Sequence, residues 1–327
     1  MKWLLVVLLL ISSTACINTK YIPQESLKPA VAYLPLVDES TASQYAPIFL
    51  VEENDILYNR IGTPSVIRRE SGGLRVHVDP ERPTIYAQKF SFKTEKASYA
   101  NYIYRIHFQK VPFSFFPFYL TGGKNVGLII IVTIDEEDNP VLLTTVHTCG
   151  CYLAFVPTSF LPESAFPKDW KFEKQRVYGE NLPGILYMDD NLYENLKSKI
   201  VIVLKNATHR IKWISIQHVE NIKKDYNFFN SPIVPMKQLQ ILGQADEPIS
   251  FFETSGPKKG YVKGSHKPFE KLLMSWWAMD LYVGEDKDFE PNKDTGAIFY
   301  TSLKFWDRTD SDMRNFKNFL SYWGWKL

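Results

Sequence analysis

Two apolar runs separated by a short acidic segment constrain the fold of this chain more than any other feature. Residues 125–133 and 141–155 flank the sequence DEEDNP at 135–140. An acidic segment with Asn and Pro between two β-type runs is typical of a hairpin connection. The first run is apolar almost throughout, which indicates a central strand covered on both faces. The chain is therefore expected to build a sheet around this hairpin.

Shorter β-type runs extend that expectation along the chain. Residues 74–78 alternate strictly between apolar and polar, and residues 102–108 form a run that ends before Pro112. Residues 200–204 and 210–219 form a second pair around a polar turn. Strands through the middle followed by a helix–strand–helix end predict an α+β fold, a mostly antiparallel β-sheet core with a C-terminal helix–strand–helix region.

The C-terminal end supplies the helices of this prediction. Residues 269–283 have helical spacing after Pro268, residues 297–305 are typical of a strand, and Ser311 or Asp310 is expected to cap a final helix. This end also holds a large share of the eight tryptophans, for which core packing is expected over an exposed sugar-binding role: Trp276, Trp277, Trp306, Trp323 and Trp325. The acidic residues around 285–290 are expected to form a solvated loop.

The N-terminus is typical of an export signal. Residues 1–16 read MKWLLVVLLLISSTAC, a cationic start and a short apolar run before small residues. The apolar run is too short to span a hydrocarbon core of roughly 30 Å. A plain secretory signal cleaved near Ala15 is one interpretation. The tetrad 13–16 resembles the lipobox of bacterial lipoprotein precursors, although Ser13 stands where an aliphatic residue is usual, and this resemblance implies a lipid on Cys16.

These observations divide the chain into three parts. Residues 1–15 are expected to be a signal peptide, and residues 16–47, with four prolines, the lipidated cysteine and a tether. Residues 48–327 are expected to form a single β-rich α+β domain, with a subdivision near 157–199 as an alternative. The mature chain would then reach the membrane through the lipid on Cys16 and not through a spanning segment.

Charge and motif content narrow the function classes. Lys and Arg number 38 against 36 Asp and Glu, a net charge of +2. Because nucleic-acid binding needs a basic footprint, no nucleic-acid partner is expected. The six histidines are scattered, and no Ser–His–Asp order or nucleophile-elbow motif is present. No catalytic residue is assigned, and the sequence favours a non-enzymatic role.

One compact group of residues could carry chemistry. His147, Cys149 and Cys151 alternate within the run 141–155, and alternate side chains of a strand share a face. Imidazole and thiolate suit zinc or copper, with His107 or His77 as a further ligand. Alternatively, the two cysteines form a disulfide across Gly150, or they are simply buried. The residue types alone leave these three interpretations equally weighted.

Two stretches carry a resemblance to a known group. Residues 300–327 (YTSLKFWDRTDSDMRNFKNFLSYWGWKL) and 147–158 (HTCGCYLAFVPT) resemble an uncharacterised family of predicted lipoproteins of Gram-negative bacteria. The resemblance covers most of the mature chain, and it implies an envelope location without implying an activity. Ile17 follows the cysteine where Asp would be a retention signal, which resembles the outer-membrane sorting pattern. The expected location is the outer membrane, facing the periplasm.

Three functions are compatible with these expectations. The first is an envelope-anchored lipoprotein that acts in binding or assembly, with a protein or an envelope polymer as its partner. The second is a metal- or haem-handling periplasmic protein that uses His147, Cys149 and Cys151. The third, disfavoured because no acid/base pair can be located, is a hydrolase of an envelope polymer.

Overall fold

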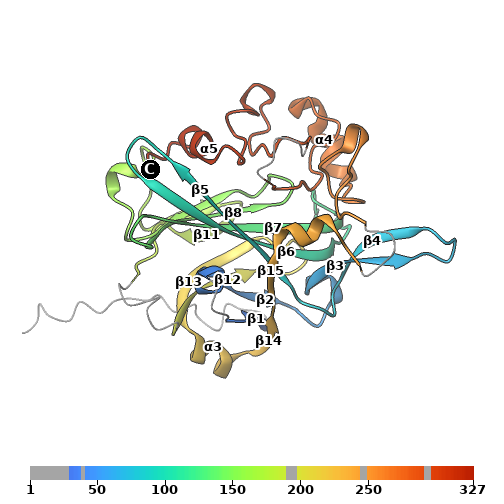
Figure 1. Ribbon diagram of the computed structural model, residues 1–327, viewed down its shortest axis with the longest axis horizontal. Helices are drawn as coiled ribbons and strands as arrows, with labels where there is room; N and C mark the ends of the chain where they lie inside the picture. Colours follow the sequence, from blue (N-terminus) through green and yellow to red (C-terminus); the bar gives the residue numbers. More distant parts are fainter. Residues whose placement is uncertain (1–28, 38–40, 189–196, 244–248, 291–295) are drawn as a thin grey trace, which may run out of the picture.

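The computed structural model describes residues 29–37, 41–188, 197–243, 249–290 and 296–327 (Figure 1). Cys16 and the signal peptide 1–15 lie outside these residues. The described chain is mostly β, with largely antiparallel sheets and a few helices. Among the described residues, every helix is too short or too polar to cross a bilayer.

The larger sheet has eight strands and is built around the predicted hairpin. Its strands are β3 (Ile61–Arg68), β4 (Leu74–Asp79), β5 (Ile85–Lys93), β6 (Ser98–Val111), β7 (Gly123–Ile134), β8 (Pro140–His147), β9 (Ala154–Pro157) and β15 (Ile233–Pro235). β7 pairs antiparallel with β6 on one side and β8 on the other. The Asp135 side chain accepts from the backbone N–H of Asn139 and so closes the acidic turn. The hairpin prediction is confirmed.

The smaller sheet has five strands in the order β13-β12-β2-β1-β14. These are β1 (Ala30–Pro35), β2 (Ile48–Glu52), β12 (Ser198–Leu204), β13 (Ile211–His218) and β14 (Asn227–Ser231). β1 pairs antiparallel with β2 and parallel with β14. The tether was expected to run to residue 47, but β1 and the helix α2 (Thr41–Tyr45) are part of the fold. β1 belongs to the fold because its last four residues are buried, and three of them are the hydrophobic residues Ala32, Tyr33 and Leu34.

The remaining elements are short. A separate hairpin joins β10 (Lys174–Val177) to β11 (Glu180–Pro183), within the region that the sequence left irregular. The α-helices after α2 are α3 (Val219–Asp225), α4 (Pro268–Ala278) and α5 (Phe316–Tyr322). Single turns of 3-10 helix are η2 (Leu57–Asn59), η3 (Glu163–Ala165), η4 (Met236–Gln240), η5 (Gly256–Lys258) and η7 (Phe305–Asp307).

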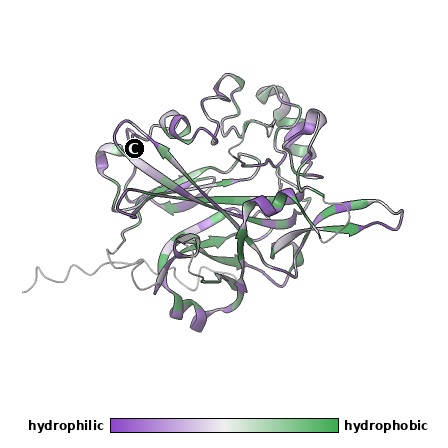
Figure 2. Ribbon diagram, in the orientation of Figure 1, coloured by the Kyte–Doolittle hydropathy of each residue, from purple (hydrophilic) through white to green (hydrophobic). Residues whose placement is uncertain are grey.

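Packing of the two sheets and the C-terminal region produces three layers. Phe49 of β2 and Ile202 of β12 share one core with Tyr104 of β6 and Ile130 of β7, so the sheets face each other. Ile131, on the opposite face of β7, packs in a second core with C-terminal aromatic residues. The C-terminal region thus covers the outer face of the larger sheet, as its position along the top of Figure 1 shows. Hydrophobic colour follows the central strands in Figure 2.

The C-terminal region departs from its prediction in two places. Residues 297–305 form no strand, and Tyr300 makes only an isolated bridge to Asp312. Their backbone instead hydrogen-bonds to a segment that follows shortly after in the sequence, where the N–H of Met313 donates to the carbonyl of Phe299. The final helix begins at Phe316, and Asn315 caps it by accepting from Asn318 N–H. The cap is therefore neither Ser311 nor Asp310.

Candidate functional site

The segment that carries His147, Cys149 and Cys151 is a tight turn between β8 and β9. β8 ends at His147, whose N–H donates to the carbonyl of Cys151 at 2.9 Å. The N–H of Gly150 donates back to the carbonyl of His147 at 2.8 Å. The expectation that the three side chains share a strand face is therefore wrong. The chain turns here and does not continue as a strand, because the backbone of His147 at one end of the motif is hydrogen-bonded to that of Cys151 at the other.

The two cysteines are joined in a disulfide within this turn, with their Cα atoms 5.6 Å apart. Gly150 between them has a φ of +95°, a conformation that favours glycine. A side chain at this position would also overlap the carbonyl oxygen of Tyr300. The disulfide turn, defined as residues 147–151, is thus fitted closely against the C-terminal region.

The histidine of the motif does not join the two sulfurs. Its ring contacts Tyr152, with ring centroids 4.8 Å apart, and burial holds its pKa well below the usual value. The side chain that lies beside the two cysteines is instead Glu270. Its carboxylate oxygen and the Cys149 and Cys151 sulfurs lie within 4.8 Å of one another. His107 accepts a hydrogen bond from Arg105 in the larger sheet, and neither His107 nor His77 belongs to this group.

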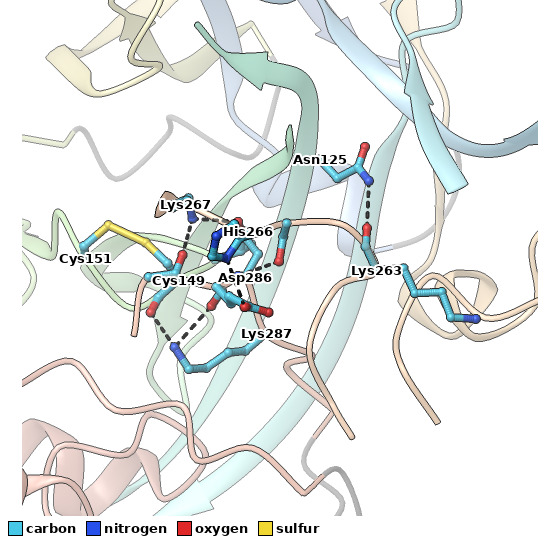
Figure 3. Close-up of polar contacts among 12 residues, drawn as sticks. Asn125, Cys149, Cys151, Lys263, His266, Lys267, Asp286 and Lys287 are labelled. Atoms are coloured by element: carbon cyan, nitrogen blue, oxygen red, sulfur yellow. Dashed lines mark hydrogen bonds and ion pairs between the residues drawn. A yellow bond between two sulfur atoms is a disulfide. The ribbon is translucent and has the colours of Figure 1, made fainter. Parts of the chain in front are cut away.

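Two buried lysines hold the disulfide turn to the C-terminal region (Figure 3). Lys287 donates to the Cys149 carbonyl at 2.7 Å, and burial lowers its pKa to about 8. Lys267 donates to Asp286 at 2.6 Å and to the carbonyl of Gly284. Asp286 also accepts from the hydroxyl of Thr148. Lys267, Asp286 and Lys287 are at most 2% exposed, so Lys267 and Asp286 form a buried ion pair and Lys287 is a buried cation held by backbone carbonyls.

Glu270 of α4 completes this buried cluster. Its carboxyl group packs on Gly284, where any side chain would collide with it. Burial raises the pKa of Glu270, and among the described residues its Oε2 atom has no hydrogen-bond partner. The expectation of a solvated acidic loop is wrong for this part of the chain, because Glu285, Asp286 and Asp288 are buried. The nearby lysines and backbone donors make that burial tolerable.

The arrangement of the cluster is that of a closed clamp. The cluster connects three separate segments: the disulfide turn, residues 265–270 and residues 284–287. The connections are the Lys267–Asp286 ion pair, the hydrogen bond from Lys287 to the Cys149 carbonyl, and the one from the Asp286 N–H to Ser265. Cys149 is 3% exposed and Cys151 is half-buried, so the disulfide is partly covered. A group that binds or transforms a substrate must be reached by it, and this cluster is covered by its own neighbours. Sequence reasoning found the two cysteines but missed Lys267, Lys287 and Glu270, which lie far away in the sequence.

A second feature of the structure is an exposed surface of large apolar side chains. It combines the loop 112–120, which has no charged residue, with the outward face of α4. Phe269 joins the two parts, since its ring lies within 5.7 Å of the rings of Phe113, Phe115 and Phe118. This aromatic surface consists of Phe113, Phe115, Phe116, Phe118, Leu272, Leu273, Trp276, Trp277 and Met279.

Its existence corrects the expectation that the C-terminal tryptophans pack in the core. Trp276 is 67% exposed and Trp306 is 60% exposed, whereas Trp325 alone among the five expected core tryptophans is fully buried at 2%. The spacing over 269–283 correctly predicted a helix, but α4 ends at Ala278, before the predicted end, and it faces the other way. Its buried side carries Glu270 and Ala278, and its apolar residues point outward. The polar clamp under the helix explains this orientation, because Glu270 occupies the inner face.

A hollow of about 620 Å³ lies elsewhere, between β11 and β13. Leu182, Trp213 and Ile216 are among the residues that line it, and none of the residues of the buried cluster does. Neither the hollow nor the aromatic surface therefore includes His147, Cys149 or Cys151, the residues that the sequence analysis singled out for their chemistry.

Comparison with known proteins adds no assignment. No family model matches the chain, and no curated protein or solved structure matches it either.

Proposed function

We propose that this protein is a lipid-anchored protein of the bacterial cell envelope that acts by binding, through the aromatic surface formed by loop 112–120 and α4. The observation that carries the proposal is the exposure of that surface, with Phe116 at 97% and Trp276 at 67%. Soluble monomeric domains seldom expose a contiguous apolar patch of this kind unless it contacts a partner or a membrane. The export signal and Cys16 support the envelope location.

The alternatives from the sequence receive less support. A metal-handling role needs thiolates, and Cys149 and Cys151 are bonded to each other. His147 lies outside the group formed by the sulfurs and Glu270. A hydrolase needs an acid/base pair that a substrate can reach, whereas the unpartnered carboxyl of Glu270 is covered. Binding requires only the exposed side chains.

The anchor is tested by the substitution Cys16→Ala. The parent chain is expected to remain with the membrane fraction after a carbonate wash, and the variant is expected to be released or to stay unprocessed, because it has no thiol to acylate. Labelling with radioactive palmitate measures the modification directly. Retention of a processed, unlabelled variant on washed membranes would contradict the anchor.

The binding surface is tested by photo-crosslinking in cells. A photoreactive residue replaces Phe116 in one variant and Lys223 of α3 in a control, and α3 lies on the side of the molecule away from α4 (Figure 1). Crosslinked product, whether protein, polymer or lipid, is expected from position 116 and not from position 223. Equal labelling at the two positions would refute binding through the aromatic surface.

A further inference from the structure

The chemistry of the aromatic surface identifies the kind of partner that it fits. We propose that this surface inserts into the headgroup region of a phospholipid bilayer and so forms a second membrane contact beside the lipid on Cys16. The inference rests on the proposed function, because it names the partner of the same surface. Three observations support it: the composition of the loop, the orientation of α4 and the flanking charges.

The loop presents bare aromatic rings to solvent. Residues 112–120 read PFSFFPFYL and include no charged residue. Phe116 is 97% exposed and Phe115 is 67% exposed, so the rings project beyond the body of the protein. Aromatic side chains favour the interfacial region of a bilayer, and the loop itself carries no charged group that would oppose entry into it.

The helix α4 has the geometry of a helix that lies in the plane of a membrane surface. It has 11 residues, which corresponds to about 16 Å of length, far short of a spanning helix. Leu272, Leu273 and Trp276 occupy its exposed side, while Glu270 is buried beneath it. Interfacial helices of peripheral proteins likewise present an apolar face to the lipid and keep their polar residues on the other side. The contact between Phe269 and the loop rings keeps both parts on one surface.

Two lysines lie along the edge of this surface. Lys271 is on α4 itself, which follows His266 in the sequence. Exposed Lys124 follows Gly123, which packs against the backbone of His266. The acidic groups nearby are engaged, since Glu285 pairs with Lys258 and Asp280 accepts from Tyr300. A cationic edge around an apolar face favours anionic phospholipid headgroups.

The experiment measures vesicle binding without the lipid anchor. The purified chain from residue 17 onward, which contains every described element, is mixed with vesicles of phosphatidylethanolamine and phosphatidylglycerol and sedimented. The test variant combines Phe115→Ser, Phe116→Ser, Trp276→Ser and Trp277→Ser. The matched control is Phe228→Ser with Phe229→Ser, two exposed phenylalanines of β14 on the opposite side of the molecule. Thermal unfolding checks that each variant is folded.

We expect the test variant to partition into vesicles at least about tenfold more weakly than the parent, because four apolar side chains no longer enter the lipid. The control is expected to bind as the parent does. A Trp276→Phe, Trp277→Phe variant should retain binding but lose most of the quenching of tryptophan fluorescence by brominated lipids. That result would place the outward face of α4 in contact with lipid.

The outcomes separate this inference from the proposed function. If the parent fails to bind vesicles, or the test variant binds them as well as the parent, insertion into lipid is refuted. Crosslinking from position 116 to one protein, or a parent dimer that the serine substitutions dissociate, would then assign the surface to a protein partner or a second copy and leave the proposed function standing. Absence of both vesicle binding and site-specific crosslinking would overturn both.

Discussion

Lys267 carries a positive charge that is almost completely removed from water and is balanced by Asp286. Removing one partner of such a pair leaves the other charge buried and unpaired. We expect Lys267→Met to lower the free energy of unfolding by about 3–5 kcal/mol, measured by urea denaturation. Adding Asp286→Asn should restore part of the loss. The control is Lys223→Met, which breaks the exposed pair with Glu220 and should cost at most about 0.5 kcal/mol.

Cys149 and Cys151 support a prediction about sulfur chemistry. Denatured, unreduced protein that starts at residue 17 should show no free thiol, and the reduced protein should show two, because both sulfurs are in the disulfide. Replacing both cysteines by serine should reduce stability by about 1.5 kcal/mol, the small value expected for closing a short loop. Chelators should change neither result. Two free thiols with a bound metal ion would contradict this assignment.

At the residue scale, contacts between residues close in the sequence could be predicted, and contacts between distant residues could not. Cys149 and Cys151 are two residues apart, so their pairing was among the interpretations that the sequence alone offered. Glu270 and Lys287 are more than a hundred residues away, and no local period connects them to the turn. His147 was assigned to the sulfurs on the assumption of a continuous strand, and the turn that begins there directs it elsewhere.

The helices α4 and α5 make opposite uses of their aromatic residues. Phe319 of α5 is fully buried, whereas Trp276 of α4 is exposed. We expect Phe319→Ala to cost about 3–5 kcal/mol of stability, through lost packing and a cavity. Trp276→Ala should change stability by no more than about 0.5 kcal/mol. Thermal or urea unfolding of both variants measures the difference, and similar losses for the two would place Trp276 in the core.

At the element scale, the helical spacing of α4 could be predicted from the sequence, but the direction in which its apolar face points could not. The spacing over 269–283 correctly predicted a helix, because a helical period is local. The same spacing describes a face that packs inward and a face that is presented outward, so it did not show that α4 turns Trp276 to solvent. Residues 297–305 have the composition of a strand, but composition alone supplies no neighbouring strand, and Tyr300 forms only an isolated bridge with Asp312.

The whole molecule is expected to lose stability in mild acid because it buries histidines. Burial lowers the pKa of His209 to about 3, and the pKa values of His107 and His147 are also held far below 6.5. Below about pH 6.5 the unfolded chain binds protons at these sites and the folded chain does not, so the free energy of unfolding falls as pH falls. The slope is up to about 1.4 kcal/mol per pH unit for each histidine.

Urea denaturation at several pH values between 7.5 and 4.5, a range of about three units chosen to bracket the unfolded-state histidine pKa, measures this slope. His209→Asn removes one titrating group and should make the slope shallower, even though the loss of stacking on Phe108 lowers stability at every pH. Glu270 acts in the opposite direction, since its pKa is raised by burial and its contribution is lost as pH rises. A pH-independent difference between parent and variant would contradict the prediction.

At the scale of the whole molecule, the central hairpin of the larger sheet could be read from two neighbouring apolar runs. In the smaller sheet only the pairing of β12 with β13 was predicted, from residues 200–204 and 210–219 around a polar turn. Its other pairings join distant segments: β1 with β14, and β2 with β12. Such pairings depend on the complete fold and leave no local pattern. The end of the tether was misplaced for the same reason, since β1 is recognisable as a strand only beside its partners.

The position of β1 has a mechanical consequence for a chain held by its N-terminus. β1 is the first described strand, and it is hydrogen-bonded to β2 on one side and to β14 on the other. Tension along the strand from an anchored end would load both rows of hydrogen bonds together, in shear. An edge strand pulled sideways would instead yield one bond at a time. If the chain is anchored through Cys16 as proposed, its leading segment would therefore join the fold at a strand that resists tension along its axis in shear.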